Sequence, residues 1–323
     1  MQVFVTTHST NFVDFLAFQN IYLISRGADR KTECKRLSAG EAPLTLQEEL
    51  GLRLSTVFMY DRLVFVEGPS DELVLRELAR SLRIDLTRAN VGFVHMRGIR
   101  NFVHYAAAET LEVLARRQVK MFFIVDRDEM TEAEATQMRE RLQGRATLCV
   151  LQRRELENYL LVPEAIHSML IDKLAEQGRR AESLSAEAVR RVLTDTAESL
   201  KDELIRLTTE RTALRPVFLH TRTNNGDAAA RVQAGISDLT ARLNELPDLT
   251  ARVQAEVEGS WARRALEIVP GSLVLDGCAR HYGVRYRKEA GDGARLARLL
   301  GDQISAEIQH FLEDIAGASA GRR

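Results

Sequence analysis

The sequence predicts an α/β fold, in which a mostly parallel sheet carries a helical domain that is inserted into it or appended to it. Short apolar runs of strand length alternate with longer amphipathic runs between residues 63 and 151. A long, charged stretch with a helical pattern and few strand signals follows Pro163. Strands that alternate with helices are typical of parallel sheets covered on both faces.

The predicted elements follow one another in a regular order. Residues 2–6 and 20–25 are expected to form strands, and residues 44–59 a helix. The expected sheet has strands at residues 63–66, 91–95, 121–125 and 147–151, with helices at 70–82, 101–117 and 130–142. The last of these helices begins with Thr131-x-x-Glu134, which has the form of a capping box.

The pattern becomes helical after Pro163. Helices are predicted at residues 186–209 and 228–246, with breaks near Arg215-Pro216 and Asn224-Asn225-Gly226. After Val269-Pro270-Gly271-Ser272, residues 273–275 are expected to form a short strand and residues 293–315 a last amphipathic helix. These changes divide the chain into regions 1–60, 61–163, 164–267 and 268–323, and the last region is expected to return to the sheet domain.

Composition narrows the class of protein. With 323 residues, 45% hydrophobic and 28% charged, the chain reads as globular with more than one compact unit. No apolar run reaches the roughly 20 residues of a membrane span, and no secretion signal is present. Cys34, Cys149 and Cys278 form no C-x-x-C pair, so a reducing cytoplasm is expected rather than a disulfide framework or a cysteine zinc site. The net charge of −1 leaves nucleic acid open as a partner, because attraction to phosphate depends on local patches.

Two apolar strands run directly into acidic residues. Residues 63–66 are followed by Glu67, a Gly-Pro turn, and a helix with Asp71 in its first turn. Residues 122–125 are followed by Asp126-Arg127-Asp128, and residues two apart on an extended chain point to the same side. Ligand sites of open α/β sheets form at the carboxyl ends of the strands, so we expect these acids to share one edge.

Four neighbouring carboxylates would repel one another unless cations lay among them. Oxygen ligands suit magnesium, and two such ions can activate water and stabilise the leaving oxygen of a phosphodiester. A structural interpretation stands beside this one. Asp71 is favoured at a helix start by the helix dipole, and aspartates at strand ends are often turn residues. The two motifs together are more specific than either is alone.

The segments Val66-Glu67-Gly68-Pro69-Ser70-Asp71 and Asp126-Arg127-Asp128 resemble the two signatures of the Toprim domain, over about residues 62–162. That fold is shared by topoisomerases, bacterial primases and several nucleases. The resemblance implies that Glu67, Asp126 and Asp128 hold catalytic Mg²⁺ or Mn²⁺, expected as two ions, with Asp71 as a further ligand.

Two flanking segments narrow the resemblance to OLD-family (overcoming lysogenization defect) nucleases. Residues 2–9 resemble the last strand and switch histidine of ABC-type ATPases, in which His8 would contact the γ-phosphate of the nucleotide in the full-length protein. Glu157-Asn158-Tyr159 resembles an element that follows the Toprim acids in that family, which implies that Glu157 is an additional metal ligand or an acid that contacts the metal ligands. A metal-dependent endonuclease is therefore expected.

The sequence also departs from the family pattern. It contains no Walker A motif, so we expect a C-terminal fragment of a longer ATPase-nuclease that does not itself use ATP. Where the family has a basic residue near the metals, this sequence has Ser272. The alternatives for that role are Lys288, Arg285, Arg287 and Lys120.

Basic residues near the acids are candidates for DNA contacts. Phosphate contacts would position DNA without reading its sequence. The candidates are Arg97, Arg100, Lys120, Arg154 and Lys288. Tyr159 is expected to be a packing residue, since its neighbours are apolar and nothing near it in the sequence would activate a phenol as a nucleophile. Trp261 is expected to serve in helix packing.

The function expected from these features is a two-metal endonuclease that nicks or cleaves duplex DNA. Other Toprim chemistry, as in primases or topoisomerases, is weakened by the absence of a zinc-finger pattern and of a convincing nucleophilic tyrosine. A non-catalytic module for DNA binding or dimerisation is the third interpretation, but massed acids would repel phosphate. A homodimer is open, and a helicase partner follows from family analogy alone.

Overall fold

The computed structural model describes residues 5, 22–26, 31–36, 60–106, 118–179, 184–214 and 228–317. Several predictions lie outside these residues: His8, the strand at 2–6 apart from Val5, the helix at 44–59, residues 107–117 of the helix predicted at 101–117, and the breaks at 215–216 and 224–226. The chain divides into two compact units. The sheet unit comprises residues 1–125, 131–151 and 288–323, and the helical unit comprises residues 126–130 and 152–287.

The sheet unit is built on four parallel strands. They are β3 (Arg62–Val66), β4 (Val91–His95), β5 (Lys120–Val125) and β6 (Thr147–Val150), in the spatial order β4-β3-β5-β6. In the register, Val66 lies opposite His95 and Phe65 opposite Phe123. Residues 63–66 are fully buried, as expected for a central strand covered on both faces. The predicted α/β class with a mostly parallel sheet is confirmed.

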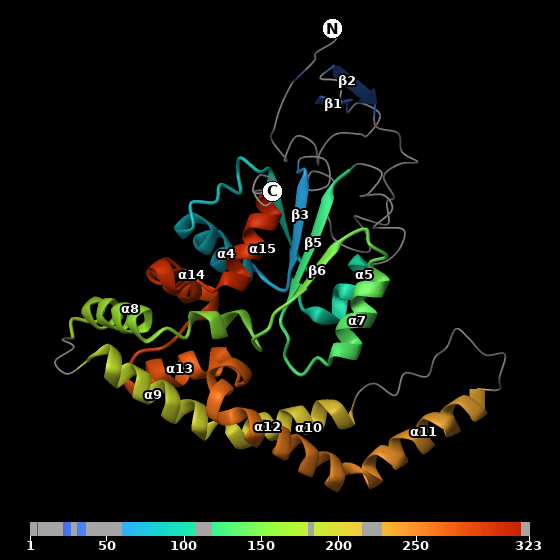
Figure 1. Cartoon of the computed structure of the whole chain (residues 1–323), viewed down its shortest axis with the longest axis vertical. Helices are drawn as coiled ribbons and strands as arrows, with labels where there is room; N and C mark the ends of the chain where they lie inside the picture. Colours follow the sequence, from blue (N-terminus) through green and yellow to red (C-terminus); the bar gives the residue numbers. More distant parts are fainter. Residues whose placement is uncertain are drawn as a thin grey trace. The chain divides into compact units, whose positions relative to one another are not determined.

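Helices cover both faces of this sheet (Figure 1). On one side lie α4 (Pro69–Ser81) and the C-terminal helices α14 (Asp292–Leu299) and α15 (Ala306–Ala316), and on the other lie α5 (Phe102–Tyr105) and α7 (Glu132–Arg141). The predicted capping box of α7 is present, because the Glu134 carboxylate accepts the Thr131 N–H at 2.8 Å and Thr131 Oγ1 accepts the Glu134 N–H.

Aromatic packing holds the two central strands together. The rings of Phe65 on β3 and Phe123 on β5 stack with centroids 4.3 Å apart. Phe102 of α5 meets Phe123 edge-on at 5.1 Å, and Tyr105 packs against Phe65. Offset and edge-on aromatic pairs add to the stabilisation from area burial alone. The packing therefore fixes the relative position of the strand ends that precede the two acidic motifs.

The helical unit contains six helices among its described residues. They are α8 (Pro163–Glu176), α9 (Ala186–Ser199), α10 (Lys201–Ala213), α11 (Ala228–Asn244), α12 (Leu246–Ile268) and α13 (Gly271–His281). Helix α9 packs against α8 and α13, and α10 packs against α12. The partly buried Trp261 packs against the buried side chains of Leu204, Val253 and Val257, which confirms its predicted role in helix packing.

Three predicted elements need correction. The strand at 273–275 is wrong, because these residues lie in α13, where Val274, Leu275, Cys278 and Ala279 form one buried helical face. An apolar run of three residues is too short to distinguish the periodicity of a strand from that of a helix. The predicted helix at 186–209 is two helices that meet at Leu200, and that at 293–315 is divided near Gly301, whose φ is +55°.

The N-terminal described residues form one small antiparallel pair. Strand β1 (Tyr22–Arg26) overlaps the strand predicted at 20–25, and it pairs with β2 (Thr32–Arg36), which was not predicted. Among all helices of the described ranges, none is long and apolar enough to cross a membrane.

Candidate active site

The two acidic motifs follow neighbouring strands. Strand β3 ends at Val66 and the next residue is Glu67, whereas β5 ends at Val125 and the next residue is Asp126. These strands pair directly and run parallel, so both end at the same edge of the sheet. The strands that precede Glu67 and Asp126 thus end at one edge of the sheet, although the two acids lie 59 positions apart in the sequence (126 − 67).

Asp71 lies in the first turn of α4 and is only 9% exposed. Its Oδ2 accepts the backbone N–H of Gly68 at 2.8 Å, which ties the helix start to the turn after Glu67. Lys288 Nζ lies 3.8 Å from the other carboxylate oxygen, and the Lys288 carbonyl faces the hydroxyl of Ser70. Asp71 therefore has a capping role, and Lys288 places a positive charge at this end of the sheet unit.

The loop after β4 is hydrogen-bonded to the backbone at the end of β3. The N–H of Met96 donates to the carbonyl of Val66 at 2.8 Å, and the N–H of Gly98 donates to the carbonyl of Glu67 at 3.2 Å. Gly98 has a φ of +102°, a conformation that favours glycine. Because Arg97 and Arg100 are exposed on this loop, the structure places two predicted phosphate-binding residues next to the Glu67 backbone.

The segment Asp126-Arg127-Asp128 is hydrogen-bonded to the backbone of the residues that precede Glu157. Oδ1 of Asp126 accepts the backbone N–H of Leu156 at 2.9 Å. The N–H of Asp128 donates to the carbonyl of Arg154 at 2.9 Å. Asp128 has a φ of +44°, in the left-handed region that aspartate enters more readily than most residues. Both acids are therefore held in place by backbone contacts within the helical unit.

Two residues that sequence reasoning missed surround Asp128. Glu129 is 7% exposed and forms an ion pair with the equally buried Arg154 through Oε1. Arg211, on α10, places Nη1 2.7 Å from the other Glu129 oxygen and 3.5 Å from Asp128 Oδ2. We call Asp128, Glu129, Arg154 and Arg211 the acid–arginine ring. The sequence shows Glu129 as a third acid directly after Asp128, but no local sequence pattern identifies Arg211.

Burial and charge have opposite effects in this ring. Burial raises the pKa of Asp128 above its ordinary value, and the neighbouring Arg154 and Arg211 only partly offset this. Burial would also raise the pKa of Glu129, but its closer contacts with the same two arginines outweigh burial and lower it. Glu129 is thus the more firmly held anion of the two.

The Glu-Asn-Tyr element forms the short 3-10 helix η3 (Leu156–Leu160), in which Glu157 is 4% exposed. The Asn158 amide donates to the carbonyls of Leu266 and Val269, both at 2.8 Å. The hydroxyl of Tyr159 accepts the N–H of Arg153, and the Arg153 guanidinium lies over its ring. Tyr159 is therefore a packing residue, as predicted.

Ser272, at the position where the resembled family has a basic residue, supplies a backbone contact instead. Its N–H donates to Glu155 Oε2 at 2.9 Å. Burial raises the pKa of Glu155, and the Ser272 hydrogen bond acts in the opposite direction. This contact joins the start of α13 to the segment before Glu157.

Two of the predicted basic residues lie where their proposed roles do not fit. Lys120 begins β5, pairs with Arg62 in the register, and so lies at the opposite edge of the sheet from the acids. The side chain of Arg154 is 7% exposed and is engaged with Glu129, so it has a structural partner in place of the predicted DNA phosphate. Arg285 and Arg287 belong to the helical unit.

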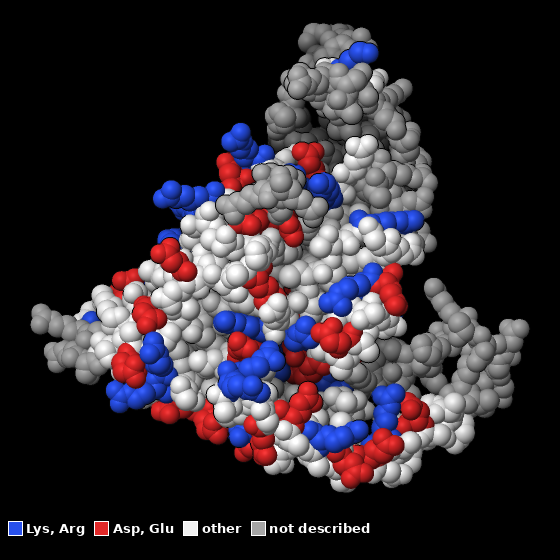
Figure 2. All heavy atoms as spheres, viewed as in Figure 1, with Lys and Arg blue, Asp and Glu red and all other residues white. Residues whose placement is uncertain are grey.

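No ligand shell is assembled among the described residues: no three carboxylate, imidazole or thiol side chains gather around one point. The donor set that follows β3 and β5 consists of carboxylate oxygens, which suit Mg²⁺ or Mn²⁺ better than softer metals. Figure 2 shows basic and acidic side chains interspersed over the described part of the visible face, in agreement with the net charge of −1.

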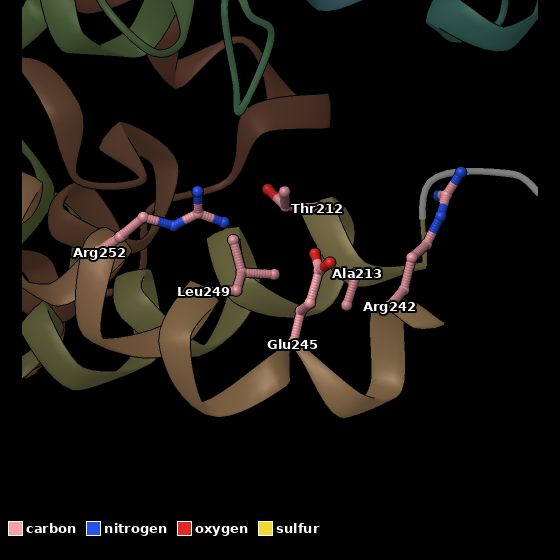
Figure 3. A pocket seen from close by; sticks show the side chains of 6 residues that line it. All are labelled: Thr212, Ala213, Arg242, Glu245, Leu249 and Arg252. Carbon is pink, nitrogen blue, oxygen red and sulfur yellow. The ribbon is translucent and has the colours of Figure 1, made fainter. Parts of the chain in front are cut away.

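The helical unit also has an open hollow of about 290 Å³ (Figure 3). Its lining carries charges of both signs, and Arg242 is paired with Asp238 at 2.9 Å. The lining residues are Thr212, Ala213, Arg242, Glu245, Leu249 and Arg252. Because none of these belongs to the acidic motifs, we place the candidate site at the strand ends.

One comparison with known proteins covers the segment that holds both acidic motifs. The model of the family described as overcoming lysogenization defect protein-like, TOPRIM domain, matches residues 58–128. This confirms the resemblance to Toprim domains over the segment that holds both motifs. A solved structure of the C-terminal region of the Xanthomonas campestris pv. campestris OLD protein is also similar. It is 16% identical, with a TM-score of 0.34, over 81% of this chain and 97% of that one. A search of curated proteins gave no match.

Proposed function

We propose that this chain is a metal-dependent DNA endonuclease that nicks or cleaves duplex DNA by two-metal phosphodiester hydrolysis. One observation carries the proposal: the neighbouring parallel strands β3 and β5 end in Glu67 and Asp126 within a segment that matches a TOPRIM domain. Carboxylates at the shared end of two strands repel one another, and a cation bound between them removes that repulsion.

The acids would hold the cofactor in this proposal. Glu67, Asp126 and Asp128 are the ligands, with Asp71 and Glu157 as further acids nearby in the sequence motifs. When bound, Mg²⁺ or Mn²⁺ supplies an activated water and stabilises the leaving oxygen of the phosphodiester. Backbone N–H groups that donate to Asp126 and Asp71 orient these carboxylates before any ion arrives.

Basic residues of the sheet unit would position the substrate. Arg97 and Arg100 extend from the loop fastened to Glu67, where they can bind phosphates beside the acids. Lys288, 3.8 Å from Asp71, is our candidate for the basic residue that offsets charge in the transition state. We expect a cytoplasmic protein whose partner is DNA.

The test is cleavage of supercoiled plasmid in Mg²⁺, Mn²⁺, Ca²⁺ or EDTA, with Asp126→Asn as the variant. We expect nicking in Mg²⁺ and Mn²⁺ that falls at least about 100-fold in the variant, more than loss of an outer-sphere partner causes. Asp302→Asn is the matched control, because this acid is exposed on η5 (Gly301–Gln303) and outside both motifs. Cleavage that survives Asp126→Asn, or DNA binding without cleavage in any metal, would contradict the proposal and favour a binding module.

A further inference from the structure

We propose that Arg211 is a place-holder cation: it neutralises Asp128 before a metal ion binds, and Glu129 retains it when the ion takes Asp128. This inference rests on the proposed function, because it takes Asp128 as a metal ligand. It assigns Arg211, on α10, a positioning role at the candidate metal centre.

The contacts of the acid–arginine ring begin and end at Asp128. Its backbone N–H donates to the carbonyl of Arg154, and the Arg154 side chain pairs with Glu129. Glu129 in turn accepts from Arg211, whose guanidinium lies beside the Asp128 carboxylate. The contacts therefore lead from the backbone of Asp128, through the buried side chains of Arg154 and Glu129 and then Arg211, back to the side chain of Asp128. A residue with a φ of +44° needs such surroundings to stay in that conformation.

Within the ring, Nη1 of Arg211 lies at different distances from the carboxylates of Glu129 and Asp128. Nη1 lies 2.7 Å from Glu129 Oε2, which is a short hydrogen bond, and 3.5 Å from Asp128 Oδ2, which is a longer and weaker contact. The contact between Arg211 and Asp128 is therefore the one that breaks first. Once Asp128 turns to a divalent ion, Arg211 still has its stronger partner and does not become an unpaired charge.

The same arrangement sets the sign of the effect on metal binding. A positive charge near Asp128 competes with a divalent ion for that carboxylate, so its removal strengthens metal binding. A purely structural Arg211 predicts the reverse, because a loosened Asp128 would bind metal more weakly. The direction of the change thus separates the two roles.

Arg211→Gln is the decisive variant, because the side chain is 40% exposed and its loss leaves the buried Glu129–Arg154 pair intact. The charge-retaining control is Arg211→Lys. The matched charge-loss control is Arg206→Gln, since Arg206 lies on the same helix and pairs with Glu203 and Glu210 instead. Thermal unfolding verifies that each variant is folded.

The measurement is a titration with Mn²⁺ alone, followed by the electron paramagnetic resonance signal of the free ion. We expect Arg211→Gln to bind Mn²⁺ on the order of tenfold more tightly, with Arg211→Lys and Arg206→Gln close to the unchanged chain. An affinity that is unchanged or weaker in a folded Arg211→Gln variant overturns this inference alone. An unchanged chain that binds no Mn²⁺ overturns the proposed function and this inference with it.

Discussion

Burial separates the three cysteines at the scale of single residues. Burial raises the pKa of the Cys278 thiol to about 12. The pKa of Cys149 is also raised to about 12, first by burial and then by the nearby Glu307 carboxylate. Cys34, on β2, is exposed. Because the thiolate is the reactive form, a raised pKa removes reactivity at ordinary pH.

We expect iodoacetamide at pH 8 to modify Cys34 well before Cys149 or Cys278. With a pKa of about 12, only about 10⁻⁴ of a thiol is ionised at pH 8, against roughly a quarter of an ordinary cysteine. Mass spectrometry of tryptic peptides over time would follow each site, and the unfolded chain would serve as the control. Equal labelling rates of Cys34 and Cys278 in the folded chain would contradict the assignment.

The positions of Glu67 and Asp126 could be predicted because each of these two acids follows a strand directly. Glu67 and Asp126 needed only the recognition of two apolar runs and the rule that parallel strands share an edge. Arg211 could not be predicted, since it meets Glu129 across 82 positions and lies on a helix with many similar charges. Contacts that depend on tertiary packing leave no local pattern in a single sequence.

At the scale of elements, long periodic or strongly apolar segments were predicted best. The strand at 91–95 was predicted with the bounds that the structure gives β4. The division between α9 and α10 at Leu200 was missed because neither glycine nor proline marks it. The strand at 273–275 was wrong because a short apolar run fits a buried helix face equally well.

The junction between η3 and α13 is the contact of the helical unit that we would test by substitution. A Cβ atom on Gly271 would lie 2.7 Å from the backbone nitrogen of Asn158 and 2.8 Å from its Oδ1. The Asn158 amide also holds the carbonyls of Leu266 and Val269. A side chain at Gly271 would therefore push against a group that is already fixed by hydrogen bonds.

Gly271→Ala is expected to lower the free energy of unfolding by about 1–3 kcal/mol, the usual range for overpacking a filled core. Gly259→Ala is the matched control, because its Cβ would meet nothing within 4 Å in the middle of α12. That control should be neutral or raise stability by up to about 1 kcal/mol, because alanine favours helix over glycine. Urea unfolding measures both, and an unaffected Gly271→Ala variant would show that the junction can yield.

At the scale of the whole molecule, the chain leaves the sheet unit and later returns to it. Residues 152–287 form most of the helical unit, and the sheet unit resumes at Lys288. The returning helices α14 and α15 pack against α4, the helix that carries Asp71. Leu296, Leu312 and Ile315 are fully buried there. The sheet unit is therefore complete only when α14 and α15 have folded onto α4.

Leu312→Ala tests this dependence. The side chain on α15 is fully buried, so its truncation leaves a cavity and should lower the free energy of unfolding by about 2–5 kcal/mol. Leu299→Ala, at the exposed end of α14, makes the same chemical change and should remain within about 1 kcal/mol of the unchanged chain. Hydrogen exchange of the β3 and α4 amides should quicken in Leu312→Ala alone, because these elements lie in one compact unit with α15 and are expected to open together with it. If α4 kept its full protection in that variant, the returning helices would have to be a separate folding unit.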